Sequence, residues 1–216
     1  VEREIQSLCQ RGITSVLNLQ SPDYFESLYQ DSLIGLYHEG EMKQRFFGSY
    51  FLNRPLNPKG LIHRLMVRKT NCTEMQDFIS AQTLEIYLDE ENCPVSFSSQ
   101  ALEQIMTEVA EKGFSLLLTA VGYGDLRKAY QGADAVRNKG YKNVITISSS
   151  LELKEEDRSQ LEKADSVLTT WENRVFDREI LPAEKNFSTE EAIDELTIKA
   201  AAIIGMKDQL GKIEKN

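Results

Sequence analysis

Histidine, paired cysteine and long apolar runs are scarce in this 216-residue sequence, and each shortage excludes a class of protein. The two histidines, His38 and His63, lie in different segments, and neither has metal-ligand spacing to the other or to a cysteine. The three cysteines, Cys9, Cys72 and Cys93, form no CxxC pair, and their odd number argues against a disulfide framework. A zinc site built from histidine and cysteine is therefore not expected.

The longest apolar run, "LLLTAV" at 116–121, is too short to cross a bilayer, and no signal peptide is visible. The unpaired cysteines favour a reducing, cytoplasmic location. A net charge of −9 excludes the broad basic surface that a nucleic-acid-binding protein needs, so neither a nucleic-acid nor a membrane partner is expected. The one locally basic stretch, residues 54–69, is interpreted first as a solvated loop, with contact to an anionic substrate as the alternative.

Helical and strand periods alternate along the whole chain. The patterns predict strands at 13–19, 42–52, 83–89, 114–122, 143–148 and 165–171. They predict helices at 1–11, 23–31, 73–81, 99–112, 125–139, 155–163 and 188–205. Residues 61–70 are ambiguous between helix and strand. The order requires parallel crossovers, so we expect an α/β fold with a parallel sheet of βα repeats, in a single domain over residues 1–216. Periodicity alone does not decide between an open and a barrel-like sheet.

Polar residues follow or end several predicted strands. Glu85 and Asp89 share one face of "LEIYLDE" and are candidates for acid–base chemistry. Exposed edge residues or a helix-capping Asp would give the same pattern, and this second interpretation is preferred. Gly122 and Gly124 of "VGYGD" precede a helix, where a tight turn is the first interpretation and an anionic-ligand contact the second. The pattern lacks the third glycine of a dinucleotide fingerprint.

Hydroxyl side chains end a later strand in "ISSS". Ser148 and Ser149 are candidates for binding a ligand, or for capping the next helix. No Gly-x-Ser-x-Gly elbow surrounds them, so a nucleophilic serine is disfavoured. Trp171 ends the last predicted strand, where it either lines a pocket or packs on the final helix.

Several segments, taken in order, resemble one family. "STEEAIDELTIKAAAIIGMKDQLGKIEKN" resembles the last barrel helix of metal-dependent amidohydrolases and the turn that re-enters their flanking β-sandwich. "EIQSLCQRGITSVLNL", "LYHEGEMKQRFFGSYFLN", "LEIYLDE" and "QALEQIMTEVAEKGFSLLLTAVGYGD" resemble earlier helices and strands of the long-chain subgroup. The resemblance implies a partial or degenerate TIM-barrel-like domain, either a fragment of a larger barrel or a shortened one.

The family's metal ligands are where the sequence departs from the resemblance. The family binds zinc or another divalent metal through an HxH pair on strand one, a lysine or glutamate on strand four, histidines on strands five and six, and an aspartate on strand eight. By resemblance, Glu85 occupies the strand-four position, Thr119 the strand-five histidine, and Thr146 or Ser149 the strand-six histidine. The strand-eight aspartate has no convincing counterpart, with Asp177 the nearest candidate.

Hydroxyl groups are poor neutral zinc ligands, and one glutamate among them cannot hold a hydrolytic ion. We therefore expect an amidohydrolase-like domain with no cofactor, which does not catalyse metal-dependent hydrolysis of C–N bonds by itself. Two alternatives remain open: an α/β domain that binds a small anionic ligand, and an active hydrolase completed by segments absent here. A small-molecule ligand and a homo-oligomer that covers open sheet edges are the expected partners.

Overall fold

The computed structural model describes residues 13–18, 23–75, 77–93, 95–149 and 167–169, together with single residues and short runs near both ends of the chain. Its elements follow the order β1 (Ser15–Asn18), α2 (Asp23–His38), β2 (Arg45–Leu52), α3 (Pro58–Asn71), the short 3-10 helix η1 (Thr73–Met75), β3 (Ile79–Leu88), α4 (Ser99–Glu111), β4 (Ser115–Ala120), α5 (Tyr123–Asn138), β5 (Ile145–Ser148), β6 (Val167–Thr169) and α8 (Ala200–Ile203).

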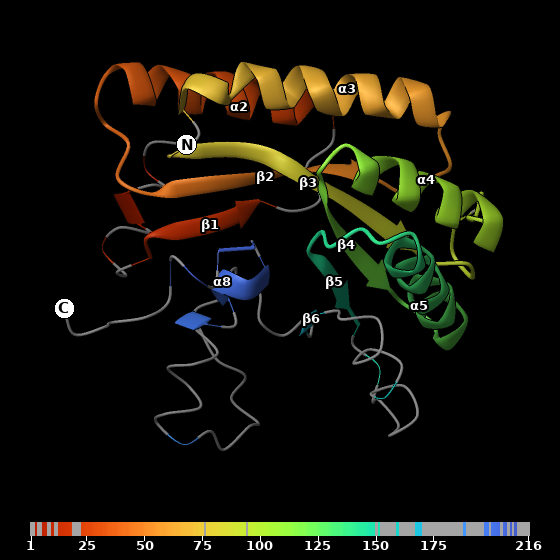
Figure 1. The fold of residues 1–216 in the computed structure, drawn as a ribbon. Helices are drawn as coiled ribbons and strands as arrows, with labels where there is room; N and C mark the ends of the chain where they lie inside the picture. The colour runs from red at the N-terminus through yellow and green to blue at the C-terminus, as the bar shows by residue number, and fades with distance from the viewer. Residues whose placement is uncertain are drawn as a thin grey trace.

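The six strands form one parallel sheet in the order in which they occur along the chain. A sheet whose neighbours are all consecutive and parallel places every connecting helix on the same face, because each crossover has the same hand. Figure 1 shows the result: the sheet curls, with α2 to α5 outside the curl. The expected α/β fold with a partial, barrel-like parallel sheet is confirmed.

The core lies between the sheet and its outer helices. It contains Leu84, Ile86, Leu116, Leu118 and Ile147 from the strands, packed with Leu61, Leu65, Leu102, Ile105, Met106, Leu126 and Ala129 from the helices. Each fully buried aliphatic side chain of this kind contributes about 1.5–3 kcal/mol relative to an exposed one. A second cluster at the amino-terminal side joins α2, β2 and β3 through Leu33, Phe46 and Ile79.

Local signals explain where several helices begin and end. The side chain of Asn57 accepts the N–H groups of Lys59 and Gly60 at the start of α3, and Ser98 accepts the N–H of Ala101 at the start of α4. Gly113 and Gly140 end α4 and α5 with φ of 80° and 83°, a conformation that suits glycine. The ambiguous segment 61–70 is helical and belongs to α3.

Two predicted boundaries are wrong for tertiary reasons. The helix predicted to end at 31 continues to His38, because its later turns bury Leu33 in the amino-terminal cluster. The helix predicted at 73–81 is reduced to η1, and β3 begins already at Ile79, which pairs with Phe46 of β2. In the second case strand pairing prevails over the local capping signal.

Several predictions fall mainly on residues outside those the structure describes. They include the helices at 1–11 and 155–163 and most of the helix at 188–205. Within the described part of the chain, no helix combines the length and the apolar character needed to span a membrane.

Candidate functional site

The candidate site is built on the concave face of the sheet, the face turned away from α2 to α5. Alternate residues of β3, β4 and β5 enter the helix-packed core, so their neighbours along each strand point the other way. A parallel register then aligns these concave residues from strand to strand. The alignment gives two rows near the carboxyl ends of the strands.

The row closest to the carboxyl ends carries hydroxyl groups, and we call it the hydroxyl tier. Tyr87 of β3 is aligned with Thr119 of β4, and Thr119 is aligned with Ser148 of β5. Thr119 is 2% exposed and Ser148 9% exposed, whereas Tyr87 is half-buried. The site candidates Thr119 and Ser148 are thus brought side by side by the sheet itself.

The row below it, which we call the deep row, mixes apolar and polar side chains. Phe51 of β2 is aligned with Glu85, Glu85 with Leu117, and Leu117 with Thr146 of β5. The ring centroids of Phe51 and Tyr87 lie 6.2 Å apart, so an aromatic pair stands beside the carboxyl group of Glu85. The two rows together combine hydroxyl, carboxyl and aromatic groups on one surface.

Glu85 is fully buried, with an exposed fraction of 0%, so the preferred interpretation as an exposed edge residue is wrong. Ser49 of β2 donates a hydrogen bond of 2.9 Å from Oγ to Glu85 Oε2. Burying a carboxyl group is costly unless it is hydrogen-bonded, and Ser49 supplies part of that compensation.

An irregularity in strand pairing decides which way Glu85 points. The register between β2 and β3 shifts by one residue between the pairs Phe47–Ser80 and Ser49–Thr83. A one-residue shift exchanges the two faces of a strand. Ile79 before the shift and Leu84 after it can therefore both enter the apolar core, while Glu85 faces the concave side.

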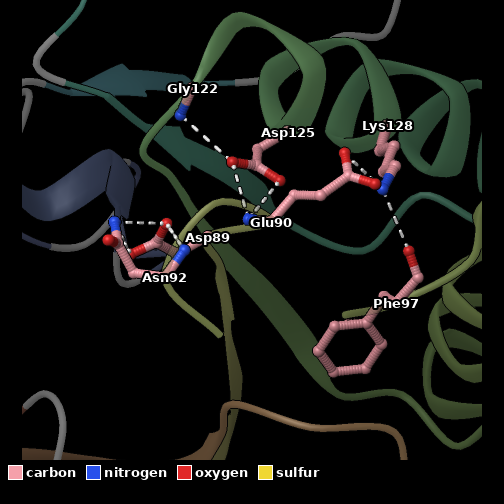
Figure 2. A network of polar contacts seen from close by, with 7 residues as sticks. All are labelled: Asp89, Glu90, Asn92, Phe97, Gly122, Asp125 and Lys128. Carbon is pink, nitrogen blue, oxygen red and sulfur yellow. Dashed lines mark hydrogen bonds and ion pairs between the residues drawn. The ribbon is translucent and has the colours of Figure 1, made fainter. Parts of the chain in front are cut away.

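Asp89 lies one residue beyond β3 and is held in a tight local network (Figure 2). Its Oδ1 accepts the backbone N–H of Asn92 at 3.1 Å and the side-chain amide of Asn92 at 3.0 Å. The phenolic group of Tyr87 donates to Asp89 Oδ2 over 3.4 Å, which links Asp89 to the hydroxyl tier. Asp89 and Glu85 thus lie near the same aromatic residue, at different depths.

The "VGYGD" segment forms the start of α5, and its own carboxylate accepts the backbone N–H of its first glycine. Asp125 Oδ2 accepts the N–H of Gly122 at 3.1 Å, and Asp125 Oδ1 accepts the N–H of Glu90 at 3.3 Å (Figure 2). A Cβ on Gly124 would lie 3.6 Å from Glu90 Oε2, in ordinary contact. The Gly122 N–H, for which contact with an anionic ligand was the second interpretation after a tight turn, is therefore engaged within the protein. Asp125 also places negative charge at the helix start.

The remaining groups at this edge include an ion pair between Lys128 and Glu90 and the thiol of Cys93. Lys128 pairs with Glu90 Oε2 at 3.0 Å and donates to the carbonyl oxygen of Phe97 (Figure 2). The ammonium group of Lys128 is therefore engaged by Glu90 and Phe97. The pKa of the Cys93 thiol is raised above its ordinary value, first by burial and then by the negative charges of Asp89 and Asp125. The two carboxylates thus add to an effect that comes first from burial.

Ser149 differs from its neighbour Ser148 in its role. Its Oγ donates to the carbonyl oxygen of Ala120 at 2.9 Å and accepts the N–H of Leu151 at 3.2 Å. These bonds join the end of β4 to the segment after β5, which is a structural function. Trp171, the last of the predicted site residues, lies outside the residues that the structure describes.

Both histidines of the chain lie on outer helices, away from the concave face. His38 is exposed in the last turn of α2, and His63 is exposed on α3. The basic stretch 54–69 is for the most part the α3 helix rather than a solvated loop. Two of its arginines contact Tyr50: Arg64 donates to its hydroxyl at 3.0 Å, and Arg68 lies 4.3 Å from its ring centroid.

The metal of amidohydrolases does not fit the side chains found here. In the described part of the chain, no group of three or more His, Cys, Asp or Glu side chains is arranged to hold a metal ion. The positions that the resemblance assigns to the strand-five and strand-six histidines are Thr119, Thr146 and Ser149, whose hydroxyls are weak neutral ligands. The donor set of the described strands therefore does not suit zinc.

Several residues of the site were not among the sequence candidates, and three of them show different reasons. Ser49 had no signal in the sequence, because its contact with Glu85 depends on the β2–β3 register. Thr146 was considered only as a substitute for a histidine. Asp125 did have a signal, since an aspartate three residues after Gly122 is typical of a helix start.

Comparison with known proteins gives similarity at the level of the fold. No protein-family model and no curated protein matches the chain. The fold is similar to the crystal structure of an uncharacterized metal-dependent hydrolase from Pyrococcus furiosus, with a TM-score of 0.66 and 12% sequence identity. The similarity covers 99% of this chain but 56% of that chain, so this chain spans little more than half the length of its structural neighbour. At this identity the match shows a shared fold.

Proposed function

We propose that this chain is an amidohydrolase-like barrel segment that does not catalyse metal-dependent hydrolysis of C–N bonds by itself. The observation that supports the proposal most directly is the hydroxyl tier. Thr119, the position that the resemblance gives to the strand-five histidine, lies between the hydroxyl-bearing residues Tyr87 and Ser148 of the adjacent strands. The chain's two histidines lie on α2 and α3, outside the sheet.

The chemistry of metal catalysis supports the same conclusion. A hydrolytic zinc ion lowers the pKa of its bound water because several strong ligands hold it with an open position. Glu85 is the carboxyl group at the level of the deep row, and its Oε2 already accepts a hydrogen bond from Ser49. One carboxyl group among neutral hydroxyls leaves the ion without the ligands that fix its geometry.

A second candidate is an active hydrolase whose ligands come from other segments. It is favoured by the length of the structural neighbour, of which this chain matches 56%. The two candidates differ in what this chain binds alone, so one experiment separates them.

The test is metal loading followed by an activity assay. The chain is stripped with a chelator, dialysed against Zn²⁺ or Mn²⁺ and analysed for bound metal, and amine release is measured from N-acyl amino acids and cyclic amides. We expect metal far below one ion per chain and no metal-dependent release, while circular dichroism shows a folded protein. Stoichiometric metal with amide hydrolysis would refute the proposal.

A further inference from the structure

Helix α3 is a basic element on an acidic protein. The chain has 34 acidic against 25 basic residues, yet no Asp or Glu occurs from residue 42 to residue 73. The basic residues of that stretch are Lys43, Arg45, Arg54, Lys59, Arg64, Arg68 and Lys69. The last four of them belong to α3, which carries no carboxylate of its own. A cluster of one sign on a protein of the opposite net charge is a local field that attracts an acidic partner.

Two apolar side chains are exposed in the middle of the same helix. Met66 is 41% exposed and Val67 46% exposed, whereas Leu61 and Leu65 of α3 are 1% exposed and lie in the core. The exposed face consists of a stripe formed by Lys59, His63, Met66, Val67 and Thr70. Residues separated by three and four positions lie one above the other along a helix, so the stripe is continuous. We call it the α3 stripe.

The cations of α3 flank the α3 stripe. At 100° per residue, Arg64 lies on one side of the stripe and Lys69 on the other. Arg64 is exposed while it donates to the hydroxyl of Tyr50 at 3.0 Å, and Lys69 lies 5.3 Å from the ring centroid of Phe114. These contacts hold the two side chains without cancelling their charge. Among the residues that the structure describes, neither Lys59 nor Lys69 has a carboxylate within ion-pair distance.

An apolar centre with basic flanks discriminates between kinds of partner. A membrane surface binds a helix through a wide apolar face, and the wide apolar face of α3 is buried in the core. Nucleic acids require cations that face the phosphates, whereas Met66 and Val67 occupy the middle of this face. A protein helix whose apolar stripe is edged by Asp or Glu complements the centre and the flanks together.

A second copy of the chain complements this face less well. Helix α4 is acidic and exposes Glu103 and Glu111, but none of its exposed side chains is a large apolar one. A copy that offered α4 to α3 would match the charge and leave Met66 and Val67 against polar groups. The partner that fits both features is therefore a different protein.

We propose that the exposed face of α3 is a docking surface for an acidic amphipathic helix of a partner protein. The partner's apolar side chains cover Met66 and Val67, and its carboxylates lie beside Lys59, Arg64 and Lys69. Figure 1 shows α3 in the layer of helices outside the curled sheet. The docking surface is thus separate from the concave face, and the proposal goes beyond the proposed function.

The test is an NMR titration of the full chain with ¹³C-labelled methionine methyl groups. Met66 reports on the α3 stripe directly, and the buried methionines serve as internal controls: Met42, Met75 and Met106. The first probe is a helical peptide as long as α3 with one stripe of Leu flanked by Glu. The second has the same composition with Leu dispersed around the helix, and the third has Lys in place of Glu.

We expect the first peptide to cause a saturable shift at the Met66 methyl group and none at the buried methionines. The second peptide should bind at least about tenfold more weakly, because its charge is kept and its apolar stripe is lost. The third should leave Met66 unchanged, because its charge has the same sign as α3.

Charge-reversed variants separate a docking surface from general attraction. Val67→Glu should weaken binding of the first peptide by about tenfold or more, because it places a carboxylate in the apolar centre. Lys59→Glu should weaken it by about three- to tenfold. Arg127→Glu is the matched control, because Arg127 is an exposed cation on the neighbouring outer helix α5, and it should change the affinity less than about twofold. All three side chains are exposed, so circular dichroism should show unchanged folding.

Each other result overturns the proposal. A shift of Met66 by vesicles of phosphatidylserine and phosphatidylcholine, or by duplex DNA, as large as that by the first peptide would assign the face to a membrane or a nucleic acid. A shift with chain concentration alone, together with a dimer in sedimentation, would assign it to a second copy. No shift with any probe, equal binding of the first two peptides, or equal losses in Lys59→Glu and Arg127→Glu would leave no docking surface. Stoichiometric zinc in the metal-loading experiment contradicts the proposed function without affecting this one.

Discussion

The two faces of the sheet differ in the polarity of the side chains that they bury. On the helix side, Ile86, Leu118 and Ile147 are fully buried in a continuous apolar core. On the concave side, the residues next to them in sequence are Glu85, Thr119 and Thr146, which are equally buried but polar. Apolar burial stabilises the fold, whereas polar burial costs stability unless each group is paired. The comparison indicates that the helix side stabilises the fold, whereas the concave side buries polar groups that need partners.

The largest effect is expected on the helix side. Replacing Ile86 with Ala should lower the free energy of unfolding by about 2–5 kcal/mol, because it leaves a cavity in the core. Urea unfolding measures this loss. Val95→Ala, at a side chain that is 55% exposed, is the control and should change stability by less than about 0.5 kcal/mol. Similar losses in both variants would contradict the assignment of the core.

The concave side should respond to the loss of a single hydroxyl group. Ser49→Ala removes the donor to Glu85 and should cost about 1.5–3 kcal/mol, because a buried carboxyl group loses a hydrogen-bond partner. Ser96→Ala, at an exposed serine in the segment before α4, should be nearly neutral in the same urea experiment. If Ser49→Ala were as neutral as the control, the Ser49–Glu85 contact would not stabilise the fold.

Helix packing on the outer side gives a comparison between two glycines. A Cβ at Gly132 of α5 would overlap the sulfur atom of Met106 on α4, so Gly132→Ala should destabilise by about 1–3 kcal/mol. Gly35 in α2 has nothing within 4 Å of its Cβ position, and Gly35→Ala should stabilise by about 0.5–1 kcal/mol. Thermal unfolding of both variants checks the opposite signs, and a stabilising Gly132→Ala would show that α4 and α5 pack less closely.

The smallest effect concerns the thiol at the acidic edge. Because burial, Asp89 and Asp125 raise the pKa of Cys93, less thiolate is present in the folded protein at pH 8 than in the unfolded chain. Alkylation of Cys93, followed by mass spectrometry, should therefore be slower in the folded state. Asp89→Asn should lower the pKa towards its ordinary value and speed alkylation a few-fold.

Burial is the first cause of the shift, so the Asp89→Asn variant should still react more slowly than the unfolded chain. The raised pKa of Cys93 also implies that the stability of the fold depends on pH. The folded state favours the protonated thiol, so this contribution to stability is present below the unfolded pKa and is lost as the pH rises through the folded pKa. An unchanged alkylation rate in Asp89→Asn would remove the support for a negative potential at this edge.

The sequence predicted most of the fold because its signals are local. Gly113 and Gly140 mark the ends of two helices, and the apolar run in "SLLLTA" marks a buried strand. The burial of Glu85 was not predictable, because it depends on a register shift between β2 and β3 that only the assembled sheet contains. The same holds for Ser49, whose partner lies 36 residues away along the chain. Tertiary pairing also shortened the helix predicted at 73–81.

The resemblance to amidohydrolases assigns Thr119 of β4 to a metal-binding histidine. The fold is shared with the neighbouring hydrolase structure, and the register places Thr119 beside Ser148 of β5 on the concave face. A pair of histidines at these two positions would stand on adjacent strands at the same level, which is a geometry that zinc accepts. The wild-type residues provide hydroxyls instead.

The most direct measurement of the central claim is a zinc titration by calorimetry of the wild type beside Thr119→His/Ser148→His. We predict no stoichiometric binding by the wild type and a clear gain by the double variant, because two imidazoles would then face the site near Glu85. Zinc bound by the wild type with a stoichiometry of about one, and lost in Glu85→Gln, would contradict the account.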